Sequence, residues 1–404
     1  MAFYVQKYGG SSVADIDKIK NVARRIVKTA REGNKVLAVV SALGDTTDEL
    51  IELARQVSPV HSRREMDLLM ATGEMISSAL LAMAIEGLGE KAVALTAPQM
   101  GIKTDVAHTR ARILHIDGER IQKEFDNGCI VVAAGFQGIT DEQDITTLGR
   151  GGSDTTAVAL AAALEADECE IYTDVEGVFT ADPRVVENAR KIDKINYEEM
   201  LELASLGTEV LQVRAVEFAW KYGVVVHVRS SFSEKEGTLI LGSDQKMEEV
   251  LVRAVTADAD QTRLTVTDVP DKPGVAASIF GSLADKNINV DMIVQSSHDR
   301  RDQANDISFM VTQSDFDDTL KVLQDEVEKI GGGGIATAEN VAKVSVVGTG
   351  MRNHPGVARK LFKTLGDAGI NIEMISTSEI KISVIVAEDE SQKAVKLLHE
   401  VFEL

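Results

Sequence analysis

Two glycine-rich turns carry the residues best suited to handling phosphate, and the first lies at the very start of the chain. Lys7-Tyr8-Gly9-Gly10-Ser11 follows an apolar stretch with strand character and precedes a helical pattern. Glycine lets backbone N–H groups approach an anion closely, and the N-terminus of a following helix favours negative charge. A lysine at the strand end can reach a terminal phosphate as a point charge. The turn alone is equally compatible with a structural role, so other motifs have to support it.

The second turn, Gly149 to Asp154, also opens a helical pattern. Ser153 or Asp154 could simply be the N-cap of that helix. A cap, however, does not require Arg150 between glycines, and a guanidinium has the fork geometry that holds a carboxylate. We therefore expect Arg150 to bind an anionic group and Asp154 to orient Lys7.

A third candidate is the irregular stretch that leads from the strand-like Ile171-Tyr172-Thr173 to Asp182-Pro183-Arg184. An Asp-Pro turn alone would be an ordinary loop feature. The stretch is long and lacks a packing pattern, which suits nucleotide recognition. Its polar groups could meet ribose and phosphate, and Phe179 could meet a base.

The elements that position these motifs alternate between strand and helix up to about residue 240. The predicted strands are 3–8, 36–41, 92–96, 130–135, 170–173 and 224–229, and the predicted helices are 15–32, 64–86, 110–127 and 153–165. This alternation predicts an α/β domain with a largely parallel sheet covered on both faces. Ligands of such sheets bind at the carboxyl ends of the strands, where the three motifs lie.

An internal repeat follows the polar stretch 241–262. Pro273-Gly274-Val275 recurs as Pro355-Gly356-Val357, and Ile288-Asn289 recurs as Ile370-Asn371 at the same spacing. So many matches in one register indicate a duplicated βαββαβ unit of α+β, ferredoxin-like type. The two copies resemble ACT domains, which sense small molecules, although purely structural dimerisation modules would show the same pattern. The predicted domains are therefore 1–245, 246–335 and 336–404.

Composition excludes several classes of function. The chain has 404 residues with a net charge of −21, no long basic run and 4% aromatic residues, which argues against nucleic-acid binding. Cys129 and Cys169 lack the spacing of a disulfide framework or zinc site. The first residues do not have the pattern of a signal peptide, and uninterrupted apolar runs such as 157–164 are too short to span a membrane. We expect a soluble cytoplasmic protein without a membrane partner.

Taken together, the motifs resemble the amino-acid kinase family and, within it, the aspartokinases. The resemblance covers essentially the whole chain. It rests on Lys7 to Ser12, Val40-Ser41-Ala42, Thr46 to Leu50, Thr72-Gly73-Glu74, Gly135 to Gly138, Gly149 to Asp154, Thr173-Asp174, Thr180 to Arg184 and the two ACT-like units. It implies phosphoryl transfer from ATP to the β-carboxylate of L-aspartate, with Mg²⁺ bridging the phosphates and no metal site made of protein ligands.

The resemblance also implies roles for individual residues. Lys7 and Asp154 would be catalytic, and the aspartate ligands would be Ser41, Thr47, Glu74 and Arg150, with Glu74 on the α-ammonium. The ATP site would comprise Lys7, Gly9, Gly10, Ser11, Thr173, Asp174, Phe179, Asp182 and Arg184. Lysine, threonine or both would bind the ACT units at Asp271, Asn289, Asp291, Gln295, His354, Asn371, Thr377 and Ser378. His61, His108 and His115 need no catalytic role, because the attacking carboxylate is already ionised at neutral pH.

Two positions add detail to this interpretation. Glu209 stands where many aspartokinases have a lysine, so a cation that could meet ATP is replaced by an anion. Met247 lies at the domain boundary and could start a separate regulatory subunit, which would give an α2β2 assembly in place of a homo-oligomer. The alternatives are a related kinase for another small carboxylate or phosphate, and a non-catalytic sensor with a decayed kinase domain. A fusion to homoserine dehydrogenase is not expected, because no further domain follows the second ACT-like unit.

Overall fold

A computed structural model describes the chain except for residues 59, 207–209, 243–250, 298–303 and 355. The described chain divides into two compact units. The first comprises 1–179 and 191–247, and the second comprises 180–190 and 248–404. The predicted domain boundary at 245/246 and Met247 fall outside the described residues.

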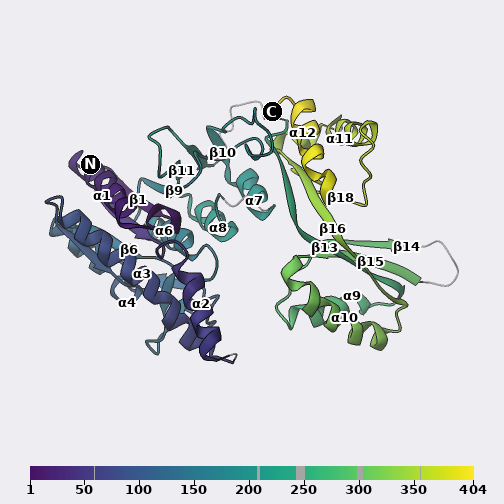
Figure 1. Ribbon diagram of the computed structural model, residues 1–404, viewed down its shortest axis with the longest axis horizontal. Helices are drawn as coiled ribbons and strands as arrows, with labels where there is room; N and C mark the ends of the chain where they lie inside the picture. The colour runs from purple at the N-terminus through teal and green to yellow at the C-terminus, as the bar shows by residue number, and fades with distance from the viewer. Residues whose placement is uncertain (59, 207–209, 243–250, 298–303, 355) are drawn as a thin grey trace. The chain divides into compact units, whose positions relative to one another are not determined.

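A central sheet organises the first unit (Figure 1). Its strand order is β10-β12-β11-β9-β1-β2-β6-β3. Pairing is parallel from β11 to β3, whereas β12 runs antiparallel to β11. The strands are β1 (Phe3–Tyr8), β2 (Lys35–Val40), β3 (Ala92–Leu95), β6 (Ile130–Ala134), β9 (Glu168–Thr173), β10 (Lys194–Asn196), β11 (Val226–Ser230) and β12 (Thr238–Leu241). The predicted parallel-rich α/β sheet is confirmed.

Helices cover both faces of this sheet, as predicted. Helices α1 (Ile16–Arg31) and α3 (Arg63–Glu86) pack on one face, and α2 (Thr46–Val57) packs against α3. The other face is covered in part by α6 (Gly152–Ala163), against which α8 (Val213–Tyr222) packs. The remaining helices are α4 (Ala97–Met100), α5 (Glu119–Asp126) and α7 (Tyr197–Ser205).

Helix α3 is the one helix of the described chain that is long and apolar enough to cross a membrane by length and composition. Half of its most apolar window is buried, and it packs on β2, β3, β6 and α1. Two carboxylates, Asp67 and Glu74, are also buried on its inner side. Packed in this way, α3 serves as a core helix of the first unit.

One predicted helix was wrong. The stretch 110–127 contains strand β5 (Ile113–Ile116) before α5, because Gly118 adopts a φ of +70° and separates the two. Strand β5 belongs to a small second sheet in the order β5-β4-β7-β8. Its other strands are β4 (Ile102–Thr104), β7 (Gln137–Ile139) and β8 (Ile145–Thr147).

The two repeat copies of the second unit share one sheet in the order β14-β15-β13-β16-β18-β17. Two long strands, β13 and β16, run through both copies, with α9 and α10 at one end and α11 and α12 at the other (Figure 1). The strands are β13 (Ala254–Pro270), β14 (Asp291–Ser297), β15 (Ala304–Val311), β16 (Gly334–Val347), β17 (Met374–Thr377) and β18 (Lys381–Ala387). The helices are α9 (Val275–Ala284), α10 (Phe316–Ile330), α11 (Gly356–Asp367) and α12 (Ser391–Val401).

This sharing completes the βαββαβ pattern in an unexpected way. The first copy ends on the first half of β16, which continues directly into the second copy. Within the described residues no strand follows α12, and the fourth strand of the second copy is the first half of β13, where Ala254 pairs with Val347. The second copy therefore takes its last strand from the segment that precedes the first copy in sequence, whereas the first copy is continuous.

The segment Thr180–Arg190 leaves the first unit and packs into the second. Ala181 and Val186 belong to the hydrophobic core around α11, α12 and β18. Thr180 Oγ1 lies 2.9 Å from His399 Nε2, and its carbonyl accepts a hydrogen bond from Val255 N. Part of the predicted nucleotide loop is thus structurally a piece of the repeat unit.

Candidate active site

Lys7 and Asp154 form an ion pair at the carboxyl end of β1. The Lys7 Nζ lies 2.5 Å from Asp154 Oδ1, and both side chains are about nine-tenths buried. Lys7 comes from the second-last position of β1, and Asp154 from the first turn of α6. Asp154 therefore holds the ammonium in place beside the glycine turn, which is the arrangement expected for a cation that meets a phosphoryl group.

The Gly9-Gly10-Ser11 turn follows directly and forms a short 3₁₀ helix from Gly10 to Ser12. The Gly9 N–H donates to Tyr172 O, so this group is occupied. Within the described chain, the N–H groups of Gly10 and Ser11 have no acceptor. Gly10 also has a packing reason, because a Cβ there would lie 3.0 Å from Gly44 O and 3.1 Å from Ala42 O. The turn is packed tightly and still leaves two donors for an anion.

A buried polar network supports the strand that carries Lys7. Tyr8 Oη donates to Gln6 Oε1, and Gln6 Nε2 donates to Glu170 Oε2 at 2.7 Å. Arg229 donates to the other oxygen of Glu170 at 2.6 Å. These bonds tie β1 to β9 and β11. Beside them lies a hollow of about 300 Å³ whose acidic and basic side chains largely pair with one another.

Glu74 projects from α3 toward the end of β2. Its Oε1 accepts from Ala42 N at 3.0 Å, whereas its Oε2 is buried and has no partner within the described chain. Burial raises the pKa of Glu74 to about 7, against the lowering effect of the Ala42 hydrogen bond. Gly73 lets the helix approach, because a Cβ there would lie 2.8 Å from the Ala42 Cβ. The free oxygen is suited to a cationic group such as an ammonium.

Two further predicted aspartate ligands, Ser41 and Thr47, lie on segments that follow β2. Ser41 follows β2, and its backbone is held by Tyr8 O and Ser77 Oγ, which leaves its hydroxyl available. Thr47 lies in the first turn of α2. Both hydroxyls therefore lie after the carboxyl end of β2.

Arg150 lies on the turn between β8 and α6, close in sequence to Asp154. It is exposed, and its guanidinium has no hydrogen bond or ion pair among the described residues. The turn is tight, since Gly149 and Gly151 have φ values of +80° and +69°, and a Cβ at Gly151 would overlap Gln212. An unpaired, exposed cation on a constrained turn is available to a carboxylate.

The predicted nucleotide residues divide between the two units. Thr173 is the last residue of β9, which pairs with β1, Asp174 follows it, and Thr173 Oγ1 donates to Asp174 Oδ1. Phe179 is still in the first unit, where it bridges to Lys191. Asp182 and Arg184 belong to the second unit and pair with each other, which lowers the pKa of Asp182. Glu209 lies outside the described residues.

The predicted effector residues gather on loops and edge strands of the second unit. Asp291 opens β14 and is paired with Lys343 at 2.7 Å, which together with Met292 N lowers the pKa of Asp291 although burial opposes this. His354 Nδ1 lies 2.8 Å from Gly350 O. The others are exposed or edge positions: Asp271, Asn289, Gln295, Asn371, Thr377 and Ser378. An effector ammonium at Asp291 would have to share that carboxylate with Lys343.

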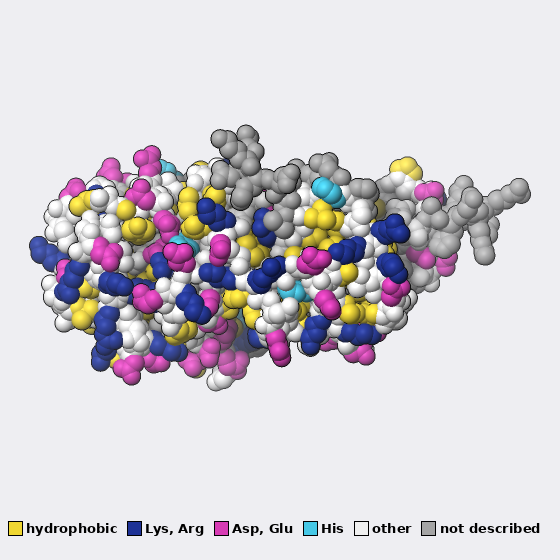
Figure 2. All heavy atoms as spheres, turned by 90° about the horizontal axis from the view of Figure 1, so that it is seen from above, with side chains coloured by type: hydrophobic (Ala, Val, Ile, Leu, Met, Phe, Trp, Pro, Cys, Tyr) yellow, Lys and Arg dark blue, Asp and Glu magenta, His cyan; other side chains and the backbone are white. Residues whose placement is uncertain are grey.

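Figure 2 shows acidic and basic side chains mixed over the face that it presents, without a continuous basic band. This agrees with the absence of a basic run in the sequence. On this face, charges of both signs alternate and would largely cancel at a distance.

Comparison with known proteins tests these expectations. The family model described as the amino acid kinase family matches residues 2–230, and an ACT domain model matches 267–327 and 344–402. The aspartokinase of Mycolicibacterium smegmatis is 50% identical over 407 residues, covering 100% of this chain and 97% of that protein.

Solved structures agree with this relationship. Escherichia coli aspartokinase III with aspartate and ADP superimposes with a TM-score of 0.84 at 25% identity, covering all of both chains. The same enzyme with lysine and aspartate gives a TM-score of 0.78 at 26% identity, covering 98% of this chain and 99% of that one. The expected fold and the two ACT matches are confirmed. The chain belongs to the amino acid kinase family, on its aspartokinase branch with ACT domains.

Proposed function

We propose that this protein transfers the γ-phosphoryl group of ATP to the β-carboxylate of L-aspartate, giving aspartyl phosphate and ADP. The observation that carries the choice of acceptor is Glu74, whose buried Oε2 lacks a partner and whose carboxyl has a raised pKa. An α-ammonium would satisfy that oxygen, and Arg150 offers an unpaired guanidinium for a carboxylate. A relative solved with aspartate and ADP supports the same pair of ligands.

The reaction requires positioning and charge neutralisation more than covalent help from the protein. The β-carboxylate oxygen attacks the γ-phosphorus, the bond to the β,γ-bridging oxygen breaks, and ADP leaves with the electron pair. Lys7 stabilises the negative charge on the transferring group, and the free N–H groups of Gly10 and Ser11 add two donors. No general base is required, because the attacking carboxylate is ionised.

Mg²⁺ fits this chemistry as an ion held mainly by phosphate oxygens. The carboxylate of Asp154 is already paired with Lys7. The metal would supply neutralisation of the ATP charge, while Asp154 keeps Lys7 oriented.

A coupled assay of ADP release tests the acceptor. Aspartate, glutamate, acetylglutamate and UMP are compared at equal concentration, with Mg²⁺ and ATP saturating. We expect turnover with aspartate only. Turnover with another acceptor and none with aspartate would place the chain among the other kinases of the fold. The absence of ADP release with all four acceptors would favour a non-catalytic sensor.

We further propose that lysine, threonine or both inhibit through the ACT units, and that the protein works in the cytoplasm as a homo-oligomer or α2β2 assembly. A relative solved with lysine supports an amino-acid effector. Saturating lysine with threonine should suppress turnover at low aspartate, and unchanged turnover would reject these effectors. A second band of ACT-unit size from the native gene, lost in Met247→Leu, would support the internal start.

A further inference from the structure

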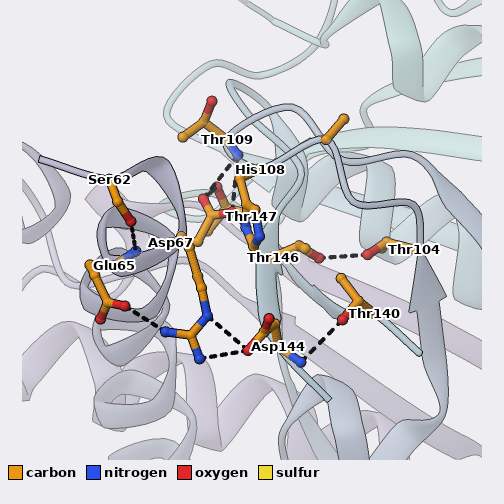
Figure 3. A network of polar contacts seen from close by, with 12 residues as sticks. Ser62, Glu65, Asp67, Thr104, His108, Thr109, Thr140, Asp144, Thr146 and Thr147 are labelled. Atoms are coloured by element: carbon orange, nitrogen blue, oxygen red, sulfur yellow. Dashed lines mark hydrogen bonds and ion pairs between the residues drawn. The ribbon is translucent and has the colours of Figure 1, made fainter. Parts of the chain in front are cut away.

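Asp67 is a buried carboxylate on α3 that has no role in the mechanism proposed above. It holds the turn at His108 and Thr109 and the end of β8 at Thr147. Asp67 is 0% exposed. It accepts from Thr109 N at 3.0 and 3.1 Å, lies 2.8 Å from His108 Nδ1 and accepts from Thr147 Oγ1 at 2.5 Å. Figure 3 shows Asp67 pointing from the helix into the turn of His108 and Thr109, with Thr147 beside it. These hydrogen bonds give partners to both oxygens of a carboxylate that is fully buried.

The turn that Asp67 holds is strained. Thr109 has a φ of +71°, which is an outlier for a β-branched residue and costs on the order of 1–3 kcal/mol. Both oxygens of Asp67 accept from the N–H of this residue, and the His108 ring is anchored on the same carboxylate. Such a conformation persists only where its surroundings impose it.

The strained turn at Thr109 packs closely against the turn Gly149–Gly151 that carries Arg150. A Cβ on Gly149 would lie 3.1 Å from Thr109 O. Thr147, the last residue of β8, is bonded to Asp67 through its hydroxyl, and its carbonyl accepts from Ala111 N. Only Leu148 and Gly149 separate Thr147 from Arg150.

Helix α8 fastens the same two loops from another side. Arg214 donates to Leu148 O and to Ala111 O, each at 2.9 Å. The guanidinium of Arg214 is partly buried, and this burial lowers its pKa. The turn before Arg150 is therefore fixed at Thr147, Leu148 and Gly149, while Arg150 itself stays exposed and unpaired among the described residues.

We propose that Asp67 is a positioning residue for Arg150: its carboxylate, through Thr147 and the strained Thr109 turn, sets the turn that presents the guanidinium to the acceptor carboxylate. The proposal rests on the function proposed above, in which Arg150 binds aspartate. A structural tie alone would stabilise the unit without favouring one substrate. A positioning role predicts that aspartate binding weakens and ATP binding does not.

The test compares Thr147→Val, which keeps the shape and removes the hydroxyl, with Thr147→Ser, which keeps the hydroxyl. Thr147→Val should raise KM for aspartate about tenfold, the loss expected for one hydrogen bond to a charged group, and leave KM for ATP within about twofold. Thr147→Ser should restore most of the affinity. Asp67→Asn should act in the same direction and more strongly, provided that circular dichroism shows it folded.

A matched control lies on the same helix. Arg64 pairs with Asp144 at 2.6 Å, which ties α3 to the residue before β8 and does not involve Thr147. Asp144→Asn should leave KM for aspartate unchanged. A similar rise in KM for both substrates, or the same rise in Asp144→Asn, would show that Asp67 only stabilises the unit and would overturn the proposal.

A double-mutant cycle shows whether the effect passes through Arg150. In an Arg150→Ala background, Thr147→Val should change KM for aspartate by less than about twofold, because the group it positions is absent. Full additivity would refute the proposal. If the wild-type protein does not phosphorylate aspartate at all, the proposed function fails first, and the two failures are thereby distinguished.

Discussion

Replacement of Glu74 by glutamine separates the cost of a buried charge from its use in binding. Glutamine keeps an acceptor for Ala42 N and replaces the unpartnered oxygen by a neutral amide. The pKa of Glu74 is raised by burial from 4.5 to about 7. A shift of that size corresponds to about 3 kcal/mol of unfavourable free energy when the carboxylate is ionised in the folded protein.

The sign of the pH dependence follows from this shift. Because the folded-state pKa lies above the unfolded one, the wild-type protein loses stability as the pH rises from about 4.5 to about 7, and the full cost is present above that range. Glu74→Gln cannot ionise and lacks this dependence. The stability of the variant relative to wild type should therefore increase by about 2–3 kcal/mol between about pH 5 and about pH 8. Any cost of the extra amide is independent of pH and drops out of the comparison.

Urea unfolding followed by tryptophan fluorescence measures the difference in stability between wild type and Glu74→Gln. The signal reports on the first structural unit, which contains Glu74. Trp220 is the single tryptophan of the chain and lies in α8, within the first unit. Identical pH dependence in wild type and Glu74→Gln would refute the argument that Glu74 is buried at an energetic cost.

Ligand binding gives the second half of the test. If the aspartate ammonium keeps Glu74 ionised, binding near pH 7 should release about half a proton, measurable by calorimetry in buffers of different ionisation enthalpy. The variant should release none and bind aspartate at least about tenfold more weakly. Unchanged affinity in Glu74→Gln would mean that the ammonium binds elsewhere.

Three further predictions concern the nucleotide side. Lys7→Met should reduce ADP release by at least about a hundredfold and should destabilise the first unit, because Asp154 loses its partner. In the double variant with Asp154→Asn, urea unfolding should show that stability is recovered, whereas activity should stay low. Recovery of activity would contradict the role of Lys7. Glu209→Lys should lower KM for ATP in the coupled assay, and an unchanged or higher value would show the position to be irrelevant. Thr180→Val removes the hydrogen bond to His399 and should raise KM for ATP about threefold or more without changing KM for aspartate, unless the 180–190 segment has no part in nucleotide binding.

The sheet and the placement of Lys7 could be predicted from sequence because their signals are local. Strand β1 was predicted with its observed bounds, and α1, α3 and α6 were predicted to within a few residues. The small sheet was missed because β4, β7 and β8 have three residues each, too few to show a period. The predicted helix 110–127 merges β5 with α5, because a single glycine such as Gly118 is tolerated within a helical pattern and is a weak signal for a break.

Features that depend on distant segments could not be predicted in this way. The sharing of β13 and β16 between the repeat copies arises from pairing across the whole unit, as does the passage of 180–190 into the core near α12. Asp67 was also missed, although it left a signal. A charged residue between apolar positions of a helical pattern is seldom buried without partners, so an aspartate amid Met66, Leu68 and Leu69 indicates donors nearby.

The two buried carboxylates of α3, Asp67 and Glu74, differ in their hydrogen-bond partners, and this difference indicates different roles. Asp67 and Glu74 lie two turns apart on the inner side of the same helix, and both are nearly inaccessible to water. Asp67 has donors on both oxygens, so its charge is met by the protein itself and can hold loops in place. Glu74 has a donor on one oxygen only, and burial leaves the other without compensation until a cation arrives. Because an unpartnered buried charge is costly, the incomplete carboxylate is the one suited to bind a ligand, and the complete one is suited to build the site around it.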